Sequence, residues 1–107
     1  MSNNKLMLYQ PKERPADLLK DVCELFSRSY VIDKAYYCMG SLLDNSAISE
    51  KIIIGMKISD NASNDQFAYV NGLCKKLSLK HDNLIFASTG EEPFKSYFSK
   101  EEPFYKS

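Results

Sequence analysis

The sequence predicts an α+β fold: a four-stranded sheet with two helices packed on one face, in the order strand, helix, strand, strand, helix, strand, plus a C-terminal tail. Residues 52–58 are rich in isoleucine and alternate as a strand does, so that positions two apart form one apolar face. Residues 15–28 and 63–80 repeat apolar side chains at spacings of three and four, as amphipathic helices do. The 107 residues are expected to form a single domain, with a frayed terminus at 1–4 and a tail at 90–107.

The first strand is expected at residues 6–9, a short apolar run that ends before Pro11. Pro15 suits the first turn of the helix that follows, because the N–H it lacks has no partner there. Asp17 adds negative charge near the positive end of the helix dipole. The core stripe of this helix is expected to consist of Leu18, Leu19, Val22, Cys23 and Phe26.

Residues 31–39 are rich in β-branched and aromatic side chains, which favours a second strand. We predict that residues 40–49 form the loop of an antiparallel hairpin, because Asp-Asn-Ser at 44–46 is a turn-forming cluster. The third strand, 52–58, then returns beside the second. Right-handed crossovers in this element order predict that the first and third strands lie in the middle of the sheet. The second face of the third strand is expected to be more open.

The second helix has a predicted start signal, since Ser63 followed by Gln66 matches a capping box. Its inward side chains are expected to be Phe67, Val70, Cys74 and Leu77. The last strand is predicted at residues 84–87. Beyond it, residues 91–98 are expected to hold one short helical turn, and two tail aromatics, Phe98 and Phe104, either fold back on the core or anchor a partner.

Composition excludes several classes of function. Lysine plus arginine equals aspartate plus glutamate, so the formal net charge is zero, and no aromatic RNA-binding signature of the RNP type is present. We therefore expect no nucleic-acid partner. Apolar runs are far shorter than the roughly 20 residues of a membrane span, and the first residues lack a signal peptide's apolar segment. We expect a cytoplasmic protein with no membrane contact.

The residues that could carry chemistry do not form a known catalytic pattern. Cys23, Cys38 and Cys74 are widely spaced and are expected to be buried free thiols. The only histidine, His81, is expected to be solvated in the connection between the second helix and the last strand. The sequence therefore predicts no enzyme, no metal site and no cofactor.

The remaining candidates are aromatic and acidic side chains suited to a protein interface. Glutamate pairs in the tail are expected to form a solvated acidic rim, which would attract a basic partner. The predicted partner-binding residues are Tyr36, Tyr37, Glu91, Glu92, Tyr97, Glu101, Glu102 and Tyr105.

Residues along nearly the whole chain resemble the C-terminal domain of the bacterial enhanced serine sensitivity protein SseB. The matching features are Gln10-Pro11 with Pro15, Leu18-Leu19 through Leu25-Phe26, Asp33-Lys34-Ala35-Tyr36, Ile52-Ile53-Ile54-Gly55 and Pro103-Phe104-Tyr105-Lys106. The closing Pro-Phe-Tyr with a basic residue is the most specific of them. Members of that family generally carry a separate N-terminal domain as well, and the residues of this sequence resemble only the C-terminal one.

The resemblance implies a non-enzymatic bacterial domain and carries no catalytic residue over. Small bacterial proteins without chemistry often neutralise toxins, so the first hypothesis is a protein-binding module and, within that class, an immunity protein whose partner is a toxin domain. The second is a regulatory domain that senses an amino acid, because the same element order occurs in such domains and the family name points to serine. Self-association into a homodimer stays open.

Overall fold

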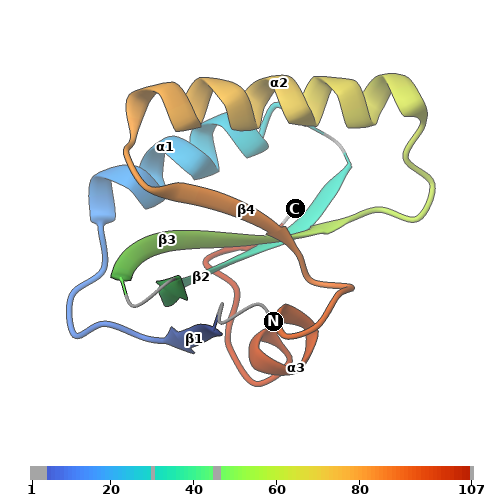
Figure 1. Ribbon diagram of the computed structural model, residues 1–107. Coiled ribbons are helices and arrows are strands. Elements are labelled where there is room, and N and C mark those ends of the chain that lie inside the picture. Colours follow the sequence, from blue (N-terminus) through green and yellow to red (C-terminus); the bar gives the residue numbers. More distant parts are fainter. Residues whose placement is uncertain (1–4, 30, 45–46, 107) are drawn as a thin grey trace.

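The computed structural model describes residues 5–29, 31–44 and 47–106. Its elements in chain order are β1 (Lys5–Tyr9), α1 (Ala16–Phe26), β2 (Ile32–Asp44), β3 (Ala47–Ile58), α2 (Asn64–Lys80), β4 (Leu84–Ser88), α3 (Phe94–Phe98) and β5 (Tyr105–Lys106). Helices α1 and α2 cover one face of the sheet and α3 lies on the opposite face (Figure 1). The predicted α+β class, with two helices on one face, is confirmed. No helix in the described residues is long and apolar enough to cross a membrane.

The strand order is β1-β2-β3-β4, and β5 pairs with β2. Pairing is antiparallel between β1 and β2 and between β2 and β3, whereas β3 and β4, joined through α2, are parallel. The central strands are therefore β2 and β3. The prediction was right for the third strand and wrong for the first, which lies at an edge. The reason is the length of β2. Its residues 39–43 pair with β1 and its residues 34–35 pair with β5, so β1 lies outside β2 at the edge of the sheet.

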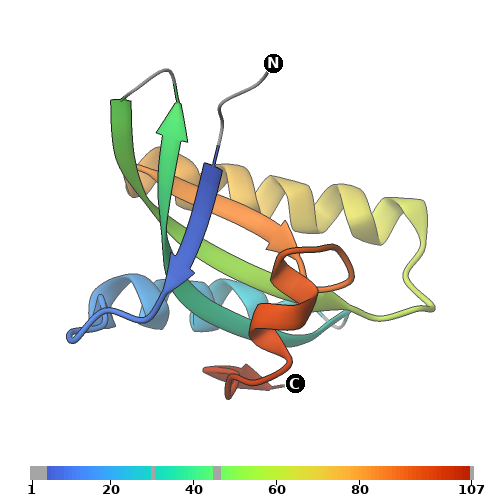
Figure 2. The ribbon, with the colours of Figure 1, turned by 60° about the horizontal axis from the view of Figure 1, so that its bottom comes forward.

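The predicted loop at 40–49 is wrong, because both hairpin strands continue through it. Pairing runs without a break from Lys34 opposite Lys57 to Asp44 opposite Ala47. Residues 45 and 46 of the predicted turn lie outside the described part of the chain. The ladder of main-chain hydrogen bonds outweighs the local turn propensity here. The long hairpin and β1 project beyond the helices (Figure 2).

The helix side of the sheet holds the larger core. Its fully buried members from the two helices are Leu18, Val22, Phe26, Val70 and Leu77, which pack with Ile54 of β3. The capping box of α2 is confirmed: Ser63 Oγ accepts from the Gln66 N–H at 3.2 Å, and Gln66 Oε1 accepts from the Ser63 N–H at 2.7 Å. Phe67 was wrongly assigned to the core, since it is 41% exposed, and Leu73 is buried in addition to Val70 and Leu77.

The opposite face is closed by the tail. The predicted short helix is α3, and its last residue, Phe98, is buried with Cys38, Ile53 and Ala87. Gly55 makes this possible, because a Cβ at that position would overlap the Phe98 ring. Of the two alternatives left open for Phe98 and Phe104, the structure shows the first: both rings pack against the core. The second face of the third strand was expected to be more open. That expectation is wrong where α3 covers the sheet.

Truncating Phe98 tests how much this closure contributes. We expect Phe98→Ala to lower the free energy of unfolding by about 3–5 kcal/mol, because it leaves a cavity over Gly55. Urea denaturation followed by circular dichroism measures the loss. The matched control is Phe67→Ala, whose ring is 41% exposed and should cost far less. Equal losses for the two variants would contradict the assignment of Phe98 to the core.

Candidate contact surface

The residues predicted to bind a partner fall in three parts of the structure. Tyr37 lies in the core and Tyr105 packs against α1. The others lie on or beside α3: Tyr36, Glu91, Glu92, Tyr97, Glu101 and Glu102. The surface around α3 is therefore the one place where the predicted residues gather.

Aromatic rings fix α3 on the sheet. Tyr36 of β2 stacks on the Phe98 ring, with centroids 5.2 Å apart and planes at 27°. Tyr97 meets the same ring edge-on at 5.4 Å and 84°. Phe94 stacks on it from one turn earlier, at 6.4 Å. The rings contribute to stability through burial and through their mutual geometry, so the positions of Tyr36 and Tyr97 are set by α3 before any partner arrives.

A groove separates β1 from α3. Its volume is about 480 Å³, and it is lined by Leu6, Leu8, Pro93, Ser96, Tyr97, Lys100 and Glu101. Leu6 and Leu8 are half-buried and belong to the smaller apolar cluster. Lys100 and Glu101 add both charges to the wall. An apolar groove with a charged rim is the composition of many protein contact sites, and it includes two of the predicted residues, Tyr97 and Glu101.

The acidic residues of the tail have different roles. The Glu92 carboxylate accepts from the Ser96 hydroxyl at 2.7 Å and from the Ser96 N–H at 3.4 Å, so it holds the first turn of α3. Glu91 and Glu102 are exposed. Glu101 is half-buried, and its charge helps to raise the pKa of the neighbouring Tyr97 phenol, after burial as the main cause. Glu91 and Glu102 are thus the acidic side chains most open to a partner.

Tyr105 belongs to the other side of the sheet. Its ring meets Phe26 of α1 edge-on at 6.1 Å, and its hydroxyl donates to the Phe26 carbonyl at 3.2 Å. The preceding residue, Phe104, donates its N–H to the Ala35 carbonyl at 2.9 Å and so continues the pairing of β5 with β2. Burial raises the pKa of the Tyr105 phenol. These contacts tie the tail to α1 and to the edge of β2.

Tyr37 is only 2% exposed, so its ring is part of the core here and not of the surface. Successive side chains of a strand point to opposite faces, and Tyr36 packs on α3, so Tyr37 lies on the helix side of β2. The Arg14 guanidinium lies 5.5 Å from the centre of the ring. The Tyr37 carbonyl accepts from Gln10 Nε2 at 2.6 Å. This bond gives the carbonyl a partner in the part of β2 that lies between its pairing with β1 and its pairing with β5.

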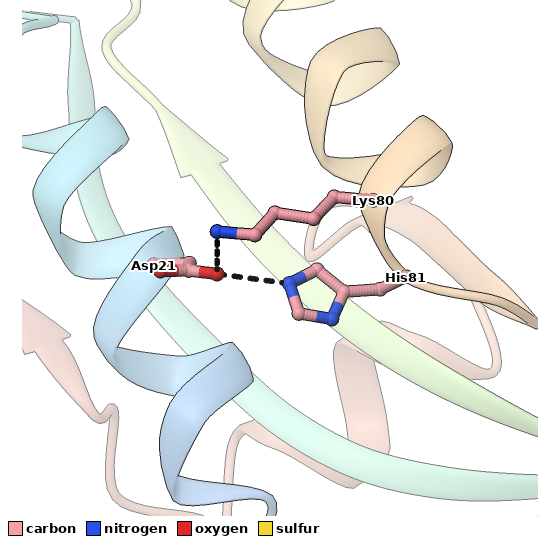
Figure 3. Close-up of polar contacts among 3 residues, drawn as sticks. All are labelled: Asp21, Lys80 and His81. Atoms are coloured by element: carbon pink, nitrogen blue, oxygen red, sulfur yellow. Dashed lines mark hydrogen bonds and ion pairs between the residues drawn. The ribbon is translucent and has the colours of Figure 1, made fainter.

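Sequence reasoning missed a polar cluster between the two large helices (Figure 3). Asp21 of α1 accepts from Lys80 Nζ at 2.9 Å, and His81 Nε2 lies 3.0 Å from the same carboxylate oxygen. The expectation of a solvated His81 is therefore corrected, since its side chain is 20% exposed and contacts Asp21. No sequence signal links Asp21 to His81, because sixty positions separate them. The cluster joins α1 to the end of α2.

The three cysteine thiols stay protonated at neutral pH. Burial raises the pKa of Cys38 to about 12, with a smaller effect from Glu101, and raises that of Cys74 to about 11. Cys23 also has a raised pKa because of burial. A thiol needs its thiolate form to act as a nucleophile or metal ligand. Among the described residues, no three His, Cys, Asp or Glu side chains group as metal ligands.

A second hollow lies where the parallel strands β3 and β4 end. Its volume is about 600 Å³, and it is lined by Met56, Lys57, Ile58, Ser59, Asp60, Phe67, Ser88, Thr89 and Gly90. The carboxyl ends of parallel strands are where α/β sheets commonly bind small ligands. Phe67, misassigned to the core from the sequence, forms part of this wall.

These features define a small α+β domain with helices on both sheet faces, a surface groove beside α3, and polar groups that bind one another. The chain belongs to the SseB protein C-terminal domain family, whose model matches residues 1–107. The resemblance drawn from the sequence is thus confirmed. The family is not known as a catalytic one. No curated protein and no solved structure matches the chain.

The Asp21 cluster gives stability a defined pH dependence. Lys80 first, and His81 next, hold the pKa of Asp21 below its ordinary value of 3.8. A carboxylate with a lowered pKa stabilises the fold above its ordinary pKa and loses that effect as the pH falls. We expect Asp21→Asn to melt below the wild type at pH 7, by a modest amount because Lys80 is largely exposed. The difference should shrink below about pH 4.

Thermal unfolding at several pH values measures this difference. The control is Asp60→Asn, which removes a carboxylate from the exposed connection before α2. A difference between Asp21→Asn and wild type that is the same at every pH would contradict an electrostatic role for Asp21.

Proposed function

We propose that this domain is a protein-binding module of a bacterial cytoplasm, and that it acts as an immunity protein which neutralises a cognate toxin by direct contact at the α3 groove. The observation that carries the proposal is the groove itself, about 480 Å³ in volume, with an apolar floor from β1 and a wall from α3 and the charged residues that follow it, Lys100 and Glu101. Interfaces of this composition exclude water at the centre and keep polar groups at the rim.

The chemistry of the groove favours a partner with basic side chains around an apolar anchor. Leu6 and Leu8 can take up an apolar side chain of the partner. Glu91 and Glu102 lie exposed on the same part of the chain as the groove wall. Surface carboxylates of this kind raise the rate of encounter with a basic protein more than they raise its affinity. A catalytic toxin domain that binds nucleic acid has the matching basic surface.

Charge reversal tests the proposal. We expect Glu91→Lys combined with Glu102→Lys to slow association with the partner by about tenfold at low salt, with little effect at high salt, because steering is screened. The partner is first isolated by co-purification from the native host with mass spectrometry, and its association rate is then measured by surface plasmon resonance.

The matched control is Glu13→Lys combined with Glu24→Lys, two exposed carboxylates away from α3. This variant should bind at the wild-type rate. Recovery of the domain without any partner at native abundance, or equal slowing by both double variants, would count against the proposal.

A second candidate function is the sensing of an amino acid, and the hollow at the ends of β3 and β4 is what favours it. Lys57 supplies a cation and Ser88 and Thr89 supply hydroxyls beside the Phe67 ring. A cation, hydroxyls and an apolar wall are groups that can recognise a zwitterion with a small side chain.

A thermal-shift screen with free amino acids tests this second function. Ligand at 100 times its dissociation constant adds about 2.7 kcal/mol of stability, so a true ligand raises the melting temperature measurably. The shift should vanish in Thr89→Val, which keeps the volume and removes the hydroxyl. If no amino acid shifts the wild type, the sensing function is excluded and the protein-binding proposal stands unaffected.

A further inference from the structure

β1 is an edge strand of the sheet. β1 ends the strand order and pairs on one side only, with β2. The chain closes the remaining edge of β2 with its own groups, since β5 pairs at Lys34 and Ala35 and the Gln10 amide binds the Tyr37 carbonyl. Among the described residues, no strand pairs with the outer N–H and C=O groups of β1.

The middle of this edge lacks the usual protection. Natural edge strands are blunted by proline, by charged side chains within the strand, or by a bulge. β1 reads Lys-Leu-Met-Leu-Tyr, with its only charge at the end, and its five pairs with β2 follow one another without an irregularity. Met7, in the middle, is 66% exposed. Such an edge is suited to pairing with another strand.

We infer that two copies of the chain associate through antiparallel pairing of their β1 strands, which joins the two sheets into one. A two-fold axis perpendicular to the sheet at Met7 pairs all five residues of β1. It places Met7 opposite Met7 of the second copy and Leu6 opposite Leu8 of the second copy, each on the same face, as antiparallel pairing requires.

Both faces of β1 gain from this register. On the α3 face, Leu6 and Leu8 of the two copies form one continuous apolar floor, so the groove of each copy is extended by the other. On the helix face, the exposed Met7 side chains meet at the axis and cover each other. The two-fold therefore buries apolar surface that a single copy leaves in water.

The charges are compatible with self-association. The formal net charge is zero, so two copies do not repel one another at long range.

The second edge strand, β4, is less suited to this role. Its Phe86 side chain is half-buried in the core under the helices, and Ala87 is buried on the α3 side. Ile85 is the large β4 side chain that is exposed, at 37%, against 66% for Met7. Strand addition at β4 would therefore cover less apolar surface.

Sedimentation velocity tests the dimer over a dilution series from about 10 µM to about 1 mM, which spans the dissociation constants of weak interfaces. We expect a concentration-dependent dimer for the wild type. Met7→Lys should remain a monomer, because it opposes two like charges at the axis, while its exposed position leaves the fold intact. The matched control, Ile48→Lys, changes a side chain that is 72% exposed on β3, two strands away from β1, and should dimerise as the wild type does.

Disulfide trapping tests the register. Residues directly opposite across antiparallel strands have Cα atoms about 4.5–5.5 Å apart, within disulfide range. Met7→Cys should form a covalent dimer about tenfold faster than Ile48→Cys under mild oxidation, because pairing raises the effective concentration of its thiols. Burial raises the pKa of the three native thiols, so they should oxidise more slowly than an exposed cysteine.

A wild-type monomer throughout the series, equal loss of the dimer in Met7→Lys and Ile48→Lys, or equal trapping of the two cysteine variants would each overturn the inference. No partner protein enters these assays. Their failure is therefore distinct from a failure of the proposed binding function.

Discussion

The contact between the Phe98 ring and the backbone of Gly55 determines how the rest of the structure is arranged. It brings α3 onto the face of the sheet opposite the large helices, where Tyr36 and Tyr97 pack on the same ring. That placement creates the groove against Leu6 and Leu8 of β1. Because protein interiors are close-packed, a side chain at residue 55 would displace the ring and with it the groove wall. One missing Cβ in β3 thus shapes a surface on another element.

Sequence patterns revealed the parts of the fold that depend on neighbours in the chain. The spacing of Val70 and Leu77 marked the inward face of α2, and Ser63 with Gln66 marked its start. The isoleucines of β3 indicated a strand with one continuous apolar face, and the element order indicated its central position. Each of these signals arises within one or two helical turns or a few residues of strand.

Features that depend on distant contacts were not predicted. The edge position of β1 follows from the extension of β2 past Gly40, where a glycine and turn-forming residues obscure the strand. Asp21 and His81 looked like unrelated polar residues, since only the packing of α1 against α2 brings them together. In the candidate surface, Tyr97 and Glu101 were identified from composition, but Leu6 and Leu8 were not, because β1 reaches α3 only through the sheet. From the sequence, Tyr37 and Tyr105 cannot be told apart from exposed anchor residues. Only the tertiary packing shows that Tyr37 is buried and that Tyr105 packs against α1.

The attachment of the tail to the middle of the sheet also affects when the domain folds during synthesis. Phe98 packs on residue 55, and β5 pairs with β2 some seventy positions earlier in the chain. Contacts of such long range close large loops and slow folding. On the ribosome, the hairpin and both large helices emerge well before the segment that covers their remaining apolar face. The nascent domain must therefore wait with one side of its sheet uncovered, and that interval is when chaperones have an apolar surface to bind.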